Sequence, residues 1–175
     1  KAINKIDLVL VTHMHKDHVN GIYDIDAKIE KIGYSIPKEE CEEYDKITDI
    51  ISRKDIEEVI LNEGDKITFK NLNIYILSPS KDEIIDSDDI LNSNSTVMLI
   101  EIIKKSKAVR LLYMGDANIK TEKSLLNGEN REYLDNIDVL QVGHHGSKTS
   151  SLPEFISYTN AKLAIISSRK KEYGH

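Results

Sequence analysis

Three histidines and one aspartate stand within six residues near the start of this 175-residue chain, at His13, His15, Asp17 and His18. The stretch before them, residues 6–12, is continuous, apolar and rich in β-branched side chains, which predicts a buried strand. The polar groups therefore lie where a strand ends and a loop begins, which is where α/β proteins carry their chemistry. Imidazole and carboxylate ligands suit Zn²⁺, Mn²⁺ or Fe²⁺ better than they suit soft metals.

Four such ligands on one short loop are too many for a single structural ion, because their geometry would clash. They suit two ions side by side, with the first two histidines on one ion and Asp17 and His18 on the other. The chain has six histidines, and the other three are His144, His145 and the last residue, His175. The histidine inventory therefore favours one metal-binding region with parts that are distant in sequence.

Five segments resemble motifs of known hydrolases. The run THMHKDH at 12–18 resembles the HxHxDH signature of the metallo-β-lactamase-fold hydrolases. Three segments resemble one branch of that superfamily, the ComEC/Rec2-type competence proteins, and are similar to phosphorylcholine esterases that act on teichoic acids: NSNSTV at 92–97, LYMGD at 112–116 and VGHHGSKTSS at 142–151. The terminal YGH at 173–175 matches a further motif of that branch. The resemblance covers nearly the whole chain and implies an α/β fold of the metallo-β-lactamase type, an αββα sandwich, with residues 1–175 as one hydrolase domain.

The resemblance also assigns roles to the later residues. It implies that Asp116 bridges two metals through its two carboxylate oxygens, although the residues alone also allow Asp116 to cap the following helix. It implies that His144 ligates the second metal, whereas His145 contacts substrate or orients a ligand. Two consecutive side chains cannot easily point both rings at one ion.

One feature departs from the superfamily pattern. Other members carry a further His between HxHxDH and the bridging Asp, but no His lies between that motif and His144. Residues 92–95 (NSNS) occupy this stretch instead, so we expect Asn94 to offer a weak amide oxygen or to hold a water. The first metal would then have only the first two histidines of the motif and Asp116 from the protein.

The charge of the predicted site favours an anionic substrate. Two divalent ions, two aspartates and a bound hydroxide leave a net charge of about +1, which attracts phosphate or carboxylate. Ser147, Lys148 and the hydroxyls at 149–151 precede a predicted helix and can cradle a phosphate. The same residues are equally compatible with a plain polar loop.

The predicted chemistry is phosphoester hydrolysis. A hydroxide bridged by two divalent ions would attack a phosphoryl group that the same ions stabilise, and Zn²⁺ is the first choice of metal, with Mn²⁺ or Fe²⁺ as alternatives. Asp17 would help to orient the hydroxide, and the candidates for a general acid are Lys148, His145 and His175. We expect a phosphodiesterase or nuclease acting on a phosphate-containing substrate such as single-stranded DNA. An esterase for phosphorylcholine or another small phosphodiester is the alternative, and a non-catalytic metal-binding fragment is the alternative of another class.

Composition narrows the remaining possibilities. Apolar residues make up 39% of the chain with no Trp and two Phe, so the core must consist of Ile, Leu and Val. No stretch approaches the roughly 20 apolar residues of a membrane span, so we expect a cytoplasmic location, or an extracytoplasmic one within a larger membrane protein. The net charge of −6 argues against a broad basic surface for nucleic acid, and the oligomeric state is left open. Only twelve residues precede HxHxDH and the chain stops on YGH, so we expect a fragment trimmed at both ends.

Periodicity and turn residues predict the elements that position these groups. We expect helices at 18–26, 38–53, 118–126 and 153–158, and further strands at 28–36, 57–61, 66–69, 73–77, 96–103, 108–113, 137–142 and 163–167. This order fits two packed sheets with helices outside.

Overall fold

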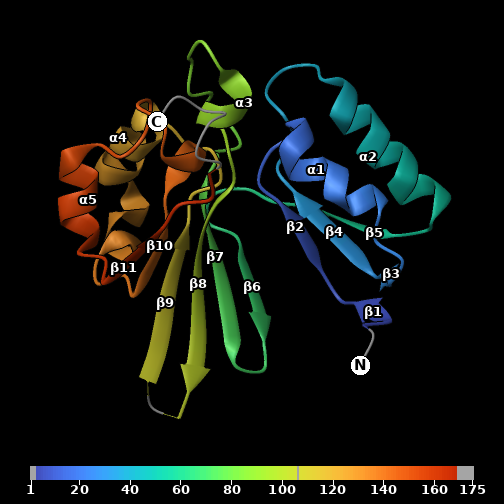
Figure 1. The fold of residues 1–175 in the computed structure, drawn as a ribbon, viewed down its shortest axis with the longest axis horizontal. Coiled ribbons are helices and arrows are strands. Elements are labelled where there is room, and N and C mark those ends of the chain that lie inside the picture. Colours follow the sequence, from blue (N-terminus) through green and yellow to red (C-terminus); the bar gives the residue numbers. More distant parts are fainter. Residues whose placement is uncertain (1–2, 106, 169–175) are drawn as a thin grey trace.

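The computed structural model describes residues 3–105 and 107–168. Two β-sheets face each other and helices cover their outer faces (Figure 1). The expected αββα sandwich is therefore confirmed. No helix in the described ranges is long and apolar enough to cross a membrane.

The N-terminal half builds a small parallel sheet in the order β2–β4–β5. Its strands are β2 (Val9–Val11), β4 (Lys31–Tyr34) and β5 (Glu57–Ile60), and β1 (Lys5–Ile6) pairs with β3 (Lys28–Ile29) beside it. Helices α1 (Lys16–Tyr23) and α2 (Glu42–Arg53) lie along the outer face of this sheet (Figure 1). Ile47 and Ile51 of α2 are four residues apart, so they lie on one helical face and join the buried core around Ile32.

The C-terminal half builds a six-stranded sheet in the order β11–β10–β9–β8–β7–β6. An antiparallel meander comprises β6 (Lys66–Phe69), β7 (Leu72–Ser78), β8 (Val97–Lys104) and β9 (Lys107–Tyr113), whereas β10 (Val139–Gln141) and β11 (Leu163–Ile165) continue parallel to β9. The outer face carries α4 (Ile119–Asn127), the 3₁₀ helix η1 (Glu129–Leu134) and α5 (Pro153–Thr159). Leu99, Leu112 and Leu140, from three neighbouring strands, are fully buried in the core that these helices cover.

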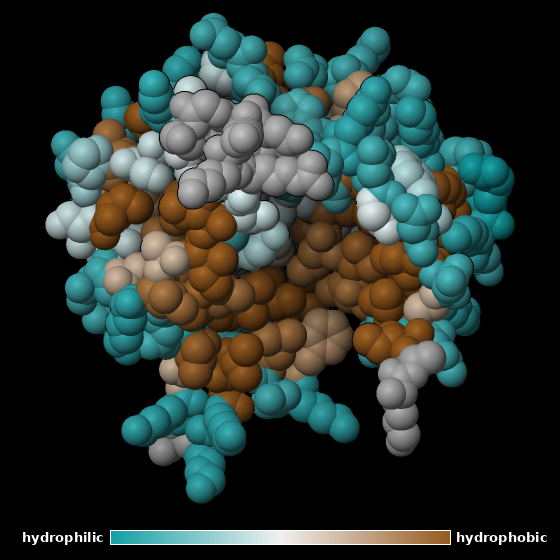
Figure 2. All heavy atoms as spheres, viewed as in Figure 1, coloured by the Kyte–Doolittle hydropathy of each residue, from teal (hydrophilic) through white to brown (hydrophobic). Residues whose placement is uncertain are grey.

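The inner face of the large sheet is covered only in part. Ile74, Ile76 and Met98 pack with residues of the small sheet in a separate core cluster. Farther across the same face, large apolar side chains of β8, β9 and β11 are 43–55% exposed, namely Ile102, Val109, Leu163 and Ile165. Figure 2 shows apolar surface gathered in the hollow between the two halves. The three strands of the small sheet are too few to cover all six strands of the large one.

One edge of the sandwich collects the polar loops. Because β9 and β10 are parallel neighbours, the segments that follow them, which carry Asp116 and residues 144–145, emerge at the same edge of the large sheet. The small sheet brings the end of β2 to this edge (Figure 1). There the Thr96 N–H donates to the Thr12 carbonyl at 2.7 Å, which joins the start of β8 to the end of β2.

Most expected elements are confirmed, and the differences concern short segments. The strand expected at 6–12 is divided into β1 and β2, the strand expected at 28–36 is divided into β3 and β4, and the helix expected at 38–53 begins at Glu42. The short helix α3 (Ile90–Ser93) and the 3₁₀ helices η1 and η2 (Gly143–Gly146) were not predicted. Elements of four to six residues are too short to show a helical period in sequence.

One buried carboxylate anchors the loop that follows the histidine pair. Glu122 of α4 is 1% exposed, and its two oxygens accept hydrogen bonds from the backbone N–H groups of Ser151 and Leu152 at 2.7 and 2.6 Å. Burial raises the pKa of this carboxyl, and the two backbone hydrogen bonds oppose that rise. The start of α5 is therefore held by a side chain of α4.

We predict that Glu122→Gln lowers the free energy of unfolding by about 1–3 kcal/mol, because the amide keeps one acceptor and places a donor against a backbone N–H. Urea denaturation measures this difference. Glu129→Gln, on exposed surface at the start of η1, is the matched control. Equal unfolding free energies for the two variants would contradict the anchoring role.

Candidate metal centre

The HxHxDH segment is divided between a loop and a helix. His13 and His15 lie in the loop after β2, whereas Asp17 and His18 lie in the first turn of α1, which begins at Lys16. The helical start turns the second pair back toward the first. The four polar side chains of the motif, although close in sequence, therefore surround a common space.

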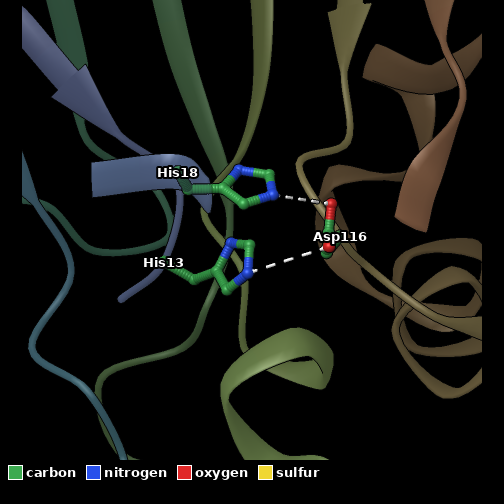
Figure 3. A group of neighbouring side chains, drawn as sticks. All are labelled: His13, His18 and Asp116. Atoms are coloured by element: carbon green, nitrogen blue, oxygen red, sulfur yellow. Dashed lines mark ion pairs between the residues drawn. The ribbon is translucent and has the colours of Figure 1, made fainter. Parts of the chain in front are cut away.

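A first group of possible ligands comprises His13, His18 and Asp116 (Figure 3). His18 Nε2 lies 3.2 Å from Asp116 Oδ1, and His13 Nε2 lies 3.9 Å from Asp116 Oδ2. His13 and Asp116 are 5% and 3% exposed. His15 joins this group from the side, because its Nδ1 lies 3.1 Å from His13 Nε2.

Thr12 orients two of these rings. Its Oγ1 lies 3.1 Å from His13 Nδ1 and 3.3 Å from His18 Nδ1. A hydroxyl oxygen can accept from both Nδ1–H groups, which leaves both Nε2 atoms on the side of Asp116, where each can bind a metal ion or carry a proton. Sequence reasoning missed Thr12, although it directly precedes the motif in the chain.

A second group comprises Asp17, His18 and His145. His145 Nε2 lies 3.3 Å from Asp17 Oδ2 and 3.4 Å from Asp116 Oδ2. His145 Nδ1 lies 2.8 Å from the Ser167 carbonyl oxygen, which only accepts, so Nδ1 carries a proton. An imidazole whose far nitrogen donates to a carbonyl has the arrangement typical of a metal-binding histidine.

His144 has different partners. Its Nδ1 lies 2.8 Å from Thr149 Oγ1 and its Nε2 lies 3.3 Å from Asn92 Nδ2. Within the described residues, His145 belongs to the second group of possible ligands and His144 to neither group. We therefore propose that His145, rather than His144, ligates a metal.

The backbone explains how the pair is divided. His144 and His145 have φ values of 47° and 55° and Gly146 follows at 78°, so three consecutive residues are left-handed. Such angles are costly for side chains larger than glycine and cluster at functional sites. A Cβ on Gly143 would lie 2.4 Å from the Ala117 carbonyl oxygen, so only glycine fits there. This backbone determines the direction in which each ring points.

The charges of His13, His18 and Asp116 influence one another's pKa values. Burial lowers the pKa of His13 to about 3, with the charge of His18 adding to the effect and that of Asp116 opposing it. Burial also acts to lower the pKa of His18, but hydrogen bonding and the charges of Asp116 and Asp17 outweigh it and raise that pKa. Burial would raise the pKa of Asp116, yet the neighbouring imidazoles hold it below its usual value. The site thus keeps an ionised carboxylate among imidazoles.

The donor set fits divalent metal ions. Imidazole nitrogens and carboxylate oxygens from the two groups are the ligands that Zn²⁺, Mn²⁺ and Fe²⁺ accept. The Nε2 of His145 lies within 3.4 Å of the carboxylates of both Asp17 and Asp116, and a cation beside these atoms would offset the negative charge of the two carboxylates.

Other expected site residues have different locations. Asn94 is 7% exposed and bound to its own loop, with Oδ1 accepting from the Ile85 N–H at 3.0 Å and Nδ2 donating to the Ile85 carbonyl, so both polar atoms of its amide already have protein partners. Lys148 is exposed and lines a cavity with His144. Ser147 Oγ accepts from Thr149 within the loop. The predictions for His175 and for the rest of the YGH motif lie outside the described residues.

Comparison with known proteins decides the family. The pattern of the beta-lactamase superfamily domain matches residues 1–146. The chain belongs to this superfamily. The chain therefore has the metallo-β-lactamase fold as well as the family's sequence pattern, and its His/Asp cluster is suited to metal.

Two curated relatives are much longer than this chain. ComE operon protein 3 of Bacillus subtilis is 30% identical over 100% of this chain and 21% of its own length. Recombination protein 2 of Haemophilus influenzae is 40% identical over 57% of this chain and 11% of its own length. These two proteins confirm the expected ComEC/Rec2-type relationship.

Solved structures agree on the fold. The metallo-beta-lactamase fold protein YhfI from Bacillus subtilis superposes with a TM-score of 0.53 at 12% sequence identity, over 93% of this chain and 66% of that protein. At this identity the likeness shows the fold alone.

We predict that His145→Ala loses one Zn²⁺ per chain, while His144→Ala keeps the wild-type metal content, because only the ring of His145 lies among the ligand groups. The loss in affinity should exceed the roughly 10–100-fold that outer-shell changes cause. Elemental analysis after loading and gel filtration counts the metal. Loss of metal from His144→Ala but not from His145→Ala would reverse the assignment.

We further predict that Asp116→Asn weakens both ions, because Asp116 lies beside both groups, whereas Asp17→Asn leaves one ion in place. An amide offers one neutral oxygen where the carboxylate offers two charged ones. The same metal count applies to both variants. Two tightly held ions in Asp116→Asn are the outcome against this prediction.

Proposed function

We propose that the chain is a metal-dependent phosphodiesterase in which Asp116 stands between two divalent ions. The observation that supports this is the position of Asp116: it belongs to the first ligand group and lies 3.4 Å from His145 of the second. His13 and His15 would complete the first ion site, and the remaining ligands of the second group would complete the other.

Two bound divalent cations would supply a water of near-neutral pKa as nucleophile and would neutralise charge on the attacked phosphoryl group. The chain's own groups would set the geometry. The Asp17 side chain is 51% exposed beside His145, so it can accept a proton from the nucleophile on the open side of the site. The burial of His13 and Asp116 excludes water from the other side.

A cavity beside the centre supports a phosphate-containing substrate. It measures about 500 Å³, and His144 and Lys148 line it together with Lys120 and Lys123. His144 and His145 have ring centroids 6.3 Å apart, so the cavity adjoins the ligand groups. Its three lysines outnumber the two aspartates that also line it, Asp88 and Asp89, so the cavity has a small excess of positive charge in spite of the net charge of −6. The relative named Recombination protein 2 adds weight to a nucleic-acid substrate such as single-stranded DNA.

A small phosphodiester such as a phosphorylcholine ester is the second candidate. The cavity volume falls within the roughly 300–1,000 Å³ of sites for small molecules, and the acidic chain favours a small substrate over a polyanion. Zn²⁺- or Mn²⁺-loaded protein should be assayed with bis-p-nitrophenyl phosphate, single-stranded DNA and p-nitrophenyl phosphorylcholine. Metal-dependent cleavage of bis-p-nitrophenyl phosphate establishes phosphodiesterase activity. The rates with single-stranded DNA and with p-nitrophenyl phosphorylcholine then decide between the two candidate substrate types. If the protein binds metal tightly but cleaves none of the three substrates, it is a metal-binding protein without the proposed activity.

We predict that Lys148→Ala slows cleavage of bis-p-nitrophenyl phosphate about ten- to a hundredfold, the effect of losing one charge-assisted contact of roughly 1.5–3 kcal/mol. Metal content should be unchanged, because Lys148 lies outside both ligand groups. Lys46→Ala, on the exposed outer surface of α2, is the matched control. Wild-type rates for Lys148→Ala would show that this loop does not contact the substrate.

A further inference from the structure

We propose that Asp89, at the start of α3, is a positioning residue that holds His15 in the orientation and tautomer needed to bind a metal through Nδ1. The inference rests on the metal binding in the proposed function. It concerns a residue far from the HxHxDH motif in sequence, in the stretch where the superfamily's additional histidine is missing.

The two nitrogens of His15 face different neighbours. Its Nδ1 lies 3.1 Å from His13 Nε2, at the ligand groups, and its Nε2 lies 3.9 Å from Asp89 Oδ1. A neutral imidazole carries one N–H, so Nδ1 has a lone pair for a metal only when Nε2 carries the proton. A carboxylate on the Nε2 side favours that tautomer, as carboxylates commonly do behind metal-binding histidines.

The carboxylate of Asp89 is fixed by its own helix. Oδ1 accepts from the Asn92 N–H at 3.0 Å and Oδ2 accepts from Asn92 Nδ2 at 2.8 Å. The Asp89 N–H also donates to Ser87 Oγ at 3.1 Å. The acid is therefore oriented before any metal binds, which is what a positioning group requires.

The same pair reaches the second histidine loop. Asn92 is 2% exposed and its Nδ2 lies 3.3 Å from His144 Nε2, so Asp89 and Asn92 together contact both histidine segments. Asn92 thereby keeps the His144 ring on the cavity side. Two residues of one short helix thus take part in orienting His15 and His144.

Asp89 is also the N-cap of α3, and the test must separate this role from the positioning role. Asn is as good an N-cap as Asp, so Asp89→Asn keeps the cap on the Asn92 N–H, while it removes the charge and the acceptor for Asn92 Nδ2. The side chains of His15 and Asp89 are 36% and 43% exposed, so the pair itself adds little to stability. Asp88→Asn, an exposed neighbour that lines the same cavity, is the matched control.

The first measurement is Zn²⁺ affinity by competition with a chromophoric chelator on the full chain. We expect Asp89→Asn to weaken one Zn²⁺ about 10–100-fold, with Asp88→Asn like wild type. Equal affinities for Asp89→Asn and wild type would overturn the inference. A wild-type protein that binds no Zn²⁺ would overturn the proposed function and this inference with it.

The second measurement needs no metal. Long-range ¹H–¹⁵N spectra of the histidine rings in metal-free protein report which nitrogen of His15 carries the proton. We expect the Nε2–H tautomer to be more populated in wild type and in Asp88→Asn than in Asp89→Asn. Equal tautomer populations in all three proteins would contradict the role of Asp89.

Discussion

A carboxylate buried among imidazoles is the constraint on which this structure depends. Asp116 is 3% exposed, and imidazole nitrogens of His18 and His145 lie 3.2 and 3.4 Å from its oxygens. An ionised carboxylate without a partner costs several kcal/mol in such a place, so positive charge must come from protonated rings or from metal ions. The strand ends, the loop backbone and the outer hydrogen bonds all keep these groups within reach of one another.

The site exists only where the two halves of the sandwich meet. Its histidine motif follows β2 of the small sheet, whereas Asp116 and His145 follow strands of the large one. Gly115 has a φ of 55°, and a Cβ there would lie 2.8 Å from the Cβ of Thr12, so the two loops touch without room for a side chain. Thr12 also orients the rings of the motif. Because an ion that binds both loops stabilises the packed state over the separated one, metal binding and the packing of the halves are coupled.

Sequence reasoning could find the residues that carry the chemistry but not all of their orientations. HxHxDH and the strand before it were recognisable because ligand type, spacing and an apolar run agree. The αββα fold was implied by the family resemblance, and the order of elements fitted it. Which of His144 and His145 faces the carboxylates depends on two left-handed φ values, and these cannot be predicted from the residue types. The contact of Asn92 with His144 depends on the phase of α3, which is only four residues long and so shows no helical period in sequence. Asp89 and Thr12 act through other side chains, so only their spatial contacts reveal them.

The consecutive histidines show how one strained turn can serve two tasks. His145 faces the carboxylates, while His144 faces a cavity that also contains Lys148. A rigid backbone with both rings directed apart fixes the distance between the metal groups and the cationic cavity, so a substrate phosphate and the nucleophile would meet at a set separation. A fixed separation between reacting groups reduces the translational and rotational freedom that must otherwise be lost before the reaction. A chain with net charge −6 can in this way draw an anion to one place, because the three lysines of this cavity outnumber its two aspartates, Asp88 and Asp89, at short range.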